Sequence, residues 1–233
     1  MTTDLQLLCA GAAQGLVKAL QERFRADTGA GVQGRFGAVG AMKEALLAGE
    51  PCDLMVLTEA MVRALATEGR LRGETCVPLG RVRTGVAVRS GQPRPDVSTP
   101  EALKAALLAA DAIHFPDPVR ATAGIHFANV MRELGIFDTL QPRFRTYPNG
   151  ATAMRELAAS PGSQAIGCTQ VTEIKYTQGV DLVGVLPPRF ELATVYSAAV
   201  ATAALQPELA ARFIALLCGR ETQDLRAAGG FEA

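Results

Sequence analysis

The chain has 233 residues, 48% of them hydrophobic, and its 23 basic and 23 acidic side chains give a formal net charge of zero. This length and hydrophobic content suffice for one large or two small domains, and the balanced charge without blocks of one sign argues against nucleic acid as a partner. No apolar run is long enough to span a bilayer, so direct membrane insertion is not expected.

The N-terminus carries no secretory signal, because Met1-Thr2-Thr3-Asp4 leads into a short apolar stretch without a basic start. The protein is therefore expected to be periplasmic if a leader has been removed and cytoplasmic otherwise. The five cysteines are scattered and odd in number, which suits a reducing compartment. With no C-x-x-C and only two histidines, the sequence predicts neither a metal site nor a cofactor.

The first third of the chain alternates strand-like and helix-like segments. Strands are expected at residues 5–10, 32–36 and 53–57, each followed by a helix. This order predicts a parallel sheet covered by helices. Two of the strand-to-helix crossings, residues 11–15 and 37–41, consist almost entirely of small residues.

The same alternation continues after a turn-rich break near residues 90–95. The expected strands are 82–90, 112–115, 143–147, 164–168 and 181–185, with a helix expected to start at Thr169, and a C-terminal helix at 208–217. Two long extended segments, near 82–90 and 193–203, bracket this α/β region. A chain that leaves one domain, builds a second and returns forms two lobes joined by two crossing strands. We therefore predict lobe 1 at 1–84 plus 196–233, lobe 2 at 85–195, and a ligand cleft between the lobes.

Small-residue loops follow strands in both predicted lobes, at 11–14, 37–41, 119–124, 149–152 and 167–170. Ligands of such sheets lie beyond the carboxyl ends of the strands, and helix N-termini favour anions. The loops therefore predict a site for a small anion, to which Arg120 would add a cation. The alternative for Arg120 is a surface ion pair, and for Thr122, Thr152 and Thr169 it is helix capping.

Several blocks of the sequence occur in a familiar order, among them CAGAAQG, FGAVGA, GRVRTGVAVR, AGIHFANVMRELGI, AIGCTQVTEI and VYSAAV. In these blocks the chain resembles the molybdate-binding protein family, the type II periplasmic solute-binding proteins of ABC transporters. The resemblance implies an α/β fold of two lobes, with two mixed sheets flanked by helices and joined by two hinge strands. It also implies an ABC transporter membrane component as a partner.

The resemblance implies ligand positions as well. Family members that bind molybdate or tungstate present a serine after each of the first two strands, where this chain has Ala12 and Val39. A tyrosine that completes the site in some members falls at Gln170, the family's small residue matches Ala123, and a backbone donor is implied near Ala151. Because the hydroxyl donors are missing, an organic carboxylate is favoured over a molybdate-like oxyanion. The predicted ligand-binding residues are Gly11, Ala12, Ala13, Val39, Gly40, Arg120, Thr122, Ala123, Ala151, Thr152, Thr169 and Gln170.

Three functions remain open from the sequence. The first, favoured here, is a binding protein for a small anion. The second is an isomerase of an unsaturated tricarboxylate such as aconitate, because a few relatives of this family resemble such isomerases. This reaction needs a base, and His126 and Glu173 are candidates only by elimination. No catalytic residue is therefore predicted. The third is a cytoplasmic anion sensor or storage protein. Neither a G-x-S-x-G elbow nor a P-loop occurs, which removes hydrolase and nucleotide-dependent readings.

Overall fold

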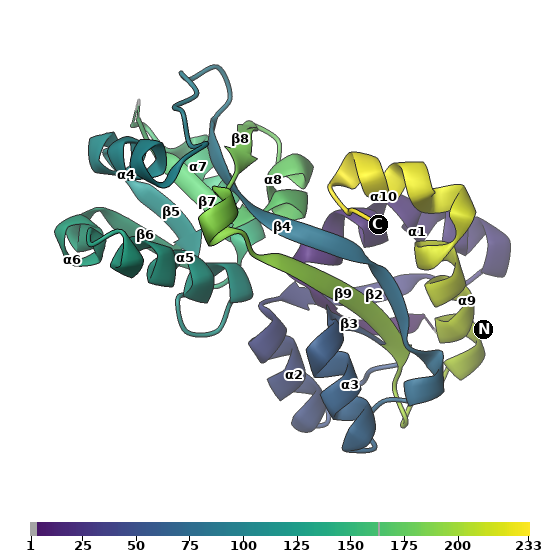
Figure 1. Cartoon of the computed structure of the whole chain (residues 1–233). Coiled ribbons are helices and arrows are strands. Elements are labelled where there is room, and N and C mark those ends of the chain that lie inside the picture. The colour runs from purple at the N-terminus through teal and green to yellow at the C-terminus, as the bar shows by residue number, and fades with distance from the viewer. Residues whose placement is uncertain (1–3, 163) are drawn as a thin grey trace. The chain divides into compact units, whose positions relative to one another are not determined.

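The computed structural model describes residues 4–162 and 164–233 (Figure 1). The chain forms two compact units: unit 1 comprises Met1–Val82 and Thr194–Ala233, and unit 2 comprises Arg83–Ala193. The chain passes from one unit to the other within two strands, β4 (Val77–Arg89) and β9 (Ala193–Val200). In the described ranges no helix is long and apolar enough to cross a membrane.

Unit 1 is built on a mixed sheet. Strand β1 (Leu5–Ala10) lies between β2 (Val32–Gly37) and β3 (Leu54–Thr58) and is parallel to both, while β9 pairs antiparallel with β3. The helices of this unit are α1 (Gln14–Thr28), α2 (Val39–Leu47), α3 (Glu59–Thr67), α9 (Pro207–Cys218) and α10 (Gln223–Gly229). Most residues of β1 and β3 are buried, as the continuous apolar runs in the sequence predict for strands covered on both faces.

Helix α1 shows how the sequence determines an element of unit 1. Leu16, Leu20 and Phe24 recur at helical spacing and are buried, so one face of the helix is apolar. Phe24 packs against Phe213 of α9 with ring centroids 4.7 Å apart. The helix ends at Gly29, whose φ of 75° is a conformation that glycine adopts without the strain a side chain would add.

Unit 2 also contains a mixed sheet. Strand β4 lies between β8 (Val180–Val185) and β7 (Ile166–Gln170) and is antiparallel to both; β5 (Ile113–Pro116) is parallel to β7 and to β6 (Phe144–Tyr147). Its helices are α4 (Pro100–Ala109), α5 (Thr122–Glu133), α6 (Phe137–Leu140), α7 (Gly150–Ala159) and α8 (Val171–Tyr176). Phe115 of β5 makes edge contacts with Phe127 of α5 and Phe144 of β6, at centroid distances of 5.7 and 5.1 Å. These rings fix α5 against the sheet.

The prediction of an α/β chain with two mixed sheets flanked by helices is confirmed. One local prediction is wrong: Thr169 and Gln170 do not start a helix but end strand β7. They pair with Gly85 and Thr84 of β4, and this pairing extends the strand by two residues before α8 begins. The described part of the chain also contains 3₁₀ turns: η1 (Gly11–Ala13), η2 (Gly73–Thr75), η3 (Gln141–Arg143), η4 (Pro188–Phe190) and η5 (Arg220–Thr222).

Candidate functional site

The predicted loop residues of unit 1 lie at two neighbouring helix starts. Ala10 and Gly37, the last residues of β1 and β2, are register partners in the parallel pair. Gly11–Ala13 form η1, which runs directly into α1, and Val39 and Gly40 are the first two residues of α2. No side chain caps η1, α1 or α2 within the described residues. This edge of the sheet therefore presents backbone N–H groups that no capping side chain occupies.

The predicted site residues at these two helix starts carry no polar side chain, and Ala12, Ala13 and Val39 present methyl groups. Ala12, Ala13 and Val39 are all buried, with Ala12 only 4% exposed. They supply no hydroxyl, so any hydrogen bond from these positions to an anion comes from the backbone. Unit 1 thus contributes amide donors surrounded by apolar surface.

In unit 2, the carboxyl ends of the parallel strands again lie beside helix starts. Pro116 and Tyr147, the last residues of β5 and β6, are register partners, and α5 begins at Thr122 and α7 at Gly150. Ala123 and Gly124 are buried in the first turn of α5. A Cβ on Gly124 would lie 2.2 Å from the carbonyl oxygen of Pro116, so only glycine lets the preceding loop fold this closely over the helix start.

Arg120 lies in that loop and is exposed. The loop is shaped by Asp117, whose carboxylate accepts hydrogen bonds from the N–H groups of Val119 and Arg120 at 2.7 and 3.1 Å. A permanent cation therefore stands in the segment that leads into α5.

The capping alternative is wrong for all three threonines. The N-cap of α5 is Ala121, so Thr122 lies inside the helix. Asn149 caps α7 by accepting the N–H of Thr152 at 2.9 Å, and the Thr152 hydroxyl instead accepts a hydrogen bond from Arg155 at 3.1 Å. Thr169 lies in strand β7 and donates its hydroxyl to Glu173. Each capping role failed because the N-cap of the helix is another residue, one position from Thr122 and Thr169 and three positions from Thr152.

Glu173 occupies the N-terminus of α7 with a carboxylate from the chain itself. Its side chain is 6% exposed, and one carboxylate oxygen accepts the Thr169 hydroxyl at 2.5 Å. Backbone N–H groups of Gly150, Ala151 and Gln170 also donate to it. Burial raises the pKa of Glu173, and these hydrogen bonds oppose that rise. The backbone donor of Ala151, predicted to bind the ligand, is thus already bonded inside the chain.

The close packing around the Glu173 carboxylate explains why residue 150 is a glycine. A Cβ on Gly150 would lie 2.0 Å from both a carboxylate oxygen of Glu173 and the hydroxyl of Thr169. A larger residue would push the carboxylate off the helix start.

Several polar side chains at this edge of unit 2 are buried without a hydrogen-bond partner in the described structure. Gln170 is 2% exposed, and neither its amide nitrogen nor its amide oxygen is bonded. The hydroxyl groups of Thr84 and Thr172 are also buried and have no hydrogen-bond partner among the described residues. Because buried polar groups are nearly always satisfied in native proteins, such groups beside a predicted ligand site indicate a ligand or water. Sequence reasoning selected Gln170 but missed Thr84 and Thr172, for which no motif gave a signal.

The two residues considered as a base are both held by internal hydrogen bonds. Nε2 of His126 lies 2.8 Å from the carbonyl oxygen of Phe190, which ties the ring to η4. Glu173 accepts the hydrogen bonds described above. Among residues 4–162 and 164–233, no group of three or more His, Cys, Asp or Glu side chains is arranged to hold a metal ion.

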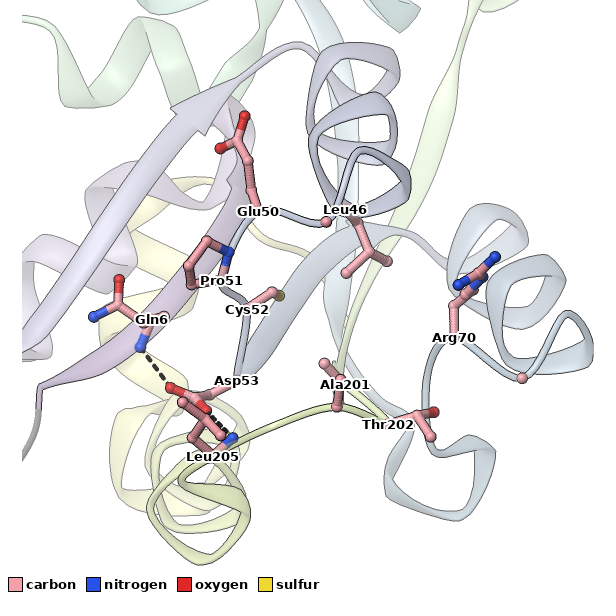
Figure 2. A pocket seen from close by; sticks show the side chains of 13 residues that line it. Gln6, Leu46, Glu50, Pro51, Cys52, Asp53, Arg70, Ala201, Thr202 and Leu205 are labelled. Atoms are coloured by element: carbon pink, nitrogen blue, oxygen red, sulfur yellow. Dashed lines mark hydrogen bonds between the residues drawn. The ribbon is translucent and has the colours of Figure 1, made fainter.

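A separate cavity of about 490 Å³ lies in unit 1, at the amino ends of β1 and β3 (Figure 2). Figure 2 shows Asp53 between Gln6 and Leu205, and its carboxylate accepts the N–H groups of Gln6, Leu205 and Gln206 at 2.8, 2.7 and 2.9 Å. Burial raises the pKa of the neighbouring Cys52 thiol to about 12, so the thiol is protonated at neutral pH. The cavity is at the wrong end of the parallel strands for a ligand of this fold, and its buried carboxylate would repel an anion.

The chain has two α/β units with mixed sheets, linked by two strands, and helix starts rich in backbone amides lie beyond the parallel strands. These features define the class of two-lobed solute-binding proteins. The model of the family described as bacterial extracellular solute-binding protein matches residues 5–232, and the chain belongs to that family. Its fold is that of the type II periplasmic binding proteins, as predicted from the sequence.

Known proteins of related fold bind oxyanions. The chain is similar to the periplasmic molybdate-binding protein of Azotobacter vinelandii, with a TM-score of 0.80, 18% identity and 99% of each chain covered. It is similar to the sulfate-binding protein of Mycobacterium tuberculosis H37Rv, with a TM-score of 0.74, 18% identity, and 99% and 86% of the two chains covered. In sequence it is also 24% identical, over 231 residues, to an aconitate isomerase of a Pseudomonas species, which covers 94% of this chain and 84% of that protein.

Proposed function

We propose that this chain is a solute-binding protein for a small organic carboxylate, which it holds with the backbone amides of the helix starts described above. The proposal rests on one observation: the helix starts of unit 1 keep their amides but present methyl groups at Ala12 and Val39. A carbon skeleton gains from contact with those methyl groups, whereas a fully hydrated inorganic oxyanion does not.

The energetic argument concerns the donors that are missing. Each hydrogen bond to a charged group contributes about 1.5–3 kcal/mol. Two absent hydroxyl donors therefore weaken binding of a molybdate-like oxyanion by about 3–6 kcal/mol, or roughly two to four orders of magnitude. An organic acid with several carboxyl groups recovers this loss by contacting polar groups elsewhere in the site.

Family membership supports the rest of the proposal. As a member of an extracellular solute-binding family, the chain would act in the periplasm and deliver its ligand to the membrane component of an ABC transporter. One structure of similar fold is described as the substrate-binding domain of a putative molybdenum ABC transporter from Clostridium difficile, with a TM-score of 0.67 and 15% identity. A cytoplasmic sensor would use the same site without the transporter.

The second candidate is an isomerase of an unsaturated tricarboxylate, favoured by the 24% identity to an aconitate isomerase along nearly the whole chain. Such a reaction removes a proton from one carbon, shifts the double bond and returns a proton to another carbon, so it needs a group that accepts and donates protons. The internal hydrogen bonds of Glu173 argue against that residue as the base. Binding is therefore the better supported function.

A calorimetric titration against molybdate, sulfate, citrate, cis-aconitate and trans-aconitate tests the proposal. We expect binding of at least one organic acid with an affinity at least tenfold above that for either inorganic anion. The double variant Ala12→Ser, Val39→Ser should reverse the preference towards molybdate. Tight molybdate binding by the wild-type protein would refute the proposal. Interconversion of the two aconitate isomers, followed by chromatography, would establish the second candidate.

A further inference from the structure

We infer that Thr84 and Gln170 form a binding pair for an oxygen-bearing group of the organic acid, one that the helix-start amides do not bind. The inference rests on the proposed function and deepens it. Thr84 matches no site position that the sequence predicted, and it lies on β4 rather than in a loop.

The two residues are adjacent because of strand register. Thr84 and Gln170 are Cα partners in the antiparallel pairing of β4 with β7, so their side chains point to the same face of the sheet. The N–H of Thr84 donates to Leu192 and its carbonyl accepts from Leu186, both at 3.1 Å, so its backbone groups do not bond to Gln170. In such a non-hydrogen-bonded pair the Cα atoms are about 4.5 Å apart and the side chains are at their closest.

Neither side chain is used by the fold. Thr84 is 1% exposed and Gln170 is 2% exposed, yet in the described structure the threonine hydroxyl and both polar atoms of the glutamine amide have no hydrogen-bond partner. A buried polar group without a hydrogen-bond partner lowers the free energy of unfolding. A chain that needed only stability would have valine and an apolar residue at these positions.

The chemistry of the pair identifies what it binds. The threonine hydroxyl and the glutamine amide nitrogen are two uncharged donors, and the hydroxyl and amide oxygen also accept. Two adjacent donors match the two oxygens of a carboxyl group, and the acceptors allow a ligand hydroxyl as well. The pair lies where β7 ends and α8 begins, at the same edge of unit 2 as the starts of α5 and α7. A ligand with one carboxylate at a helix start and a second oxygen group a few carbons away would contact both.

The test combines binding and stability. Thr84→Val and Gln170→Met remove the polar groups at nearly constant size. Calorimetric titration with citrate, cis-aconitate and trans-aconitate should show at least tenfold weaker binding for each variant, and the loss in the double variant should be smaller than the product of the single losses, because both residues contact one ligand group. In the absence of ligand, each variant should unfold at a higher temperature than the wild type, by at least about 2 °C.

Thr222→Val is the matched control in unit 1. This threonine is equally buried, but its hydroxyl donates to the carbonyl of Leu216 at 2.8 Å and accepts from Arg226 at 2.9 Å. It should lower the unfolding temperature and leave binding unchanged. If the wild type binds an acid and Thr84→Val binds it equally well, or if Thr84→Val lowers the unfolding temperature, the inference is overturned while the proposed function stands. A wild-type protein that binds none of the three acids overturns both.

Discussion

Removing the Glu173 carboxylate should destabilise unit 2 strongly. The side chain is buried and accepts four hydrogen bonds, one from Thr169 and three from backbone N–H groups at the end of β7 and the start of α7. Glu173→Ala leaves all four donors without this acceptor. A buried donor that loses its acceptor costs about 1–3 kcal/mol of unfolding free energy. Part of the total loss is offset because water enters the vacated space and no charge has to be buried. We expect a net loss of about 3–5 kcal/mol.

The assay is urea unfolding followed by far-ultraviolet circular dichroism. If the two units unfold in separate transitions, only that of unit 2 should move. Glu156→Ala is the control, because this glutamate is exposed on the same helix α7, and it should change the free energy of unfolding by less than about 0.5 kcal/mol. A loss below about 1 kcal/mol for Glu173→Ala would show that the carboxylate does not hold the helix start.

The pH dependence of a second variant, Glu173→Gln, gives a further readout. Burial raises the pKa of Glu173 above the ordinary value of 4.5, so between these two pKa values the folded protein binds more protons than the unfolded chain. The wild type therefore gains stability from this group as the pH falls towards 4.5. Glu173→Gln lacks this contribution, so its deficit relative to the wild type should be larger at pH 5 than at pH 7. An equal deficit at both pH values would contradict the direction of the shift.

Two further perturbations test unit 1 and the core of unit 2. Asp53→Asn should cost about 2–3 kcal/mol in urea unfolding and leave anion binding unchanged, because the carboxylate accepts three backbone N–H groups, two of them at the start of α9. His114 is buried on β5 with its Nε2 unpartnered in the described structure, and burial lowers its pKa below 6.5. The unfolded chain therefore binds this proton at a higher pH than the folded protein, and stability should fall as the pH is lowered from 7.5 to 5.5. His114→Phe should reduce this dependence of the unfolding temperature on pH in a thermal-unfolding series.

The elements that sequence reasoning predicted correctly are those with a strong local pattern. Leu16, Leu20 and Phe24 give helix α1 its apolar face, and Gly29 marks its end. The apolar runs that became β1 and β3 need no knowledge of their partners, because a strand buried on both faces is apolar throughout. Together with the order of the blocks, these patterns were sufficient for the fold.

The features that the sequence did not reveal depend on partners far apart in the chain. Nothing near Thr84 indicates that it will face Gln170 in an antiparallel pair. Gly150 resembles any helix-start glycine until Glu173 is seen to fill the space beside it. The capping predictions failed for a smaller reason: Thr152 was placed at a helix start, but the true cap is Asn149, and a shift of three residues changes a cap into a helix interior position.

The surroundings of Glu173 also lead to a prediction of where a ligand carboxylate would bind in unit 2. At the start of α7, Asn149 and Glu173 satisfy the backbone donors from within the chain, which shows that this design holds a carboxylate. Helix α5 begins in the same way, beyond a neighbouring parallel strand, but its N-cap is Ala121, and no side chain among the described residues caps it. Its amides still need an acceptor. Because Ala123 and Gly124 place no bulky side chain beside these amides and Arg120 lies in the loop before them, we expect the start of α5 to bind the carboxylate of the ligand. The amide of Ala151 then serves the fold, and we expect the start of α5 together with the Thr84–Gln170 pair to determine which organic acid is bound.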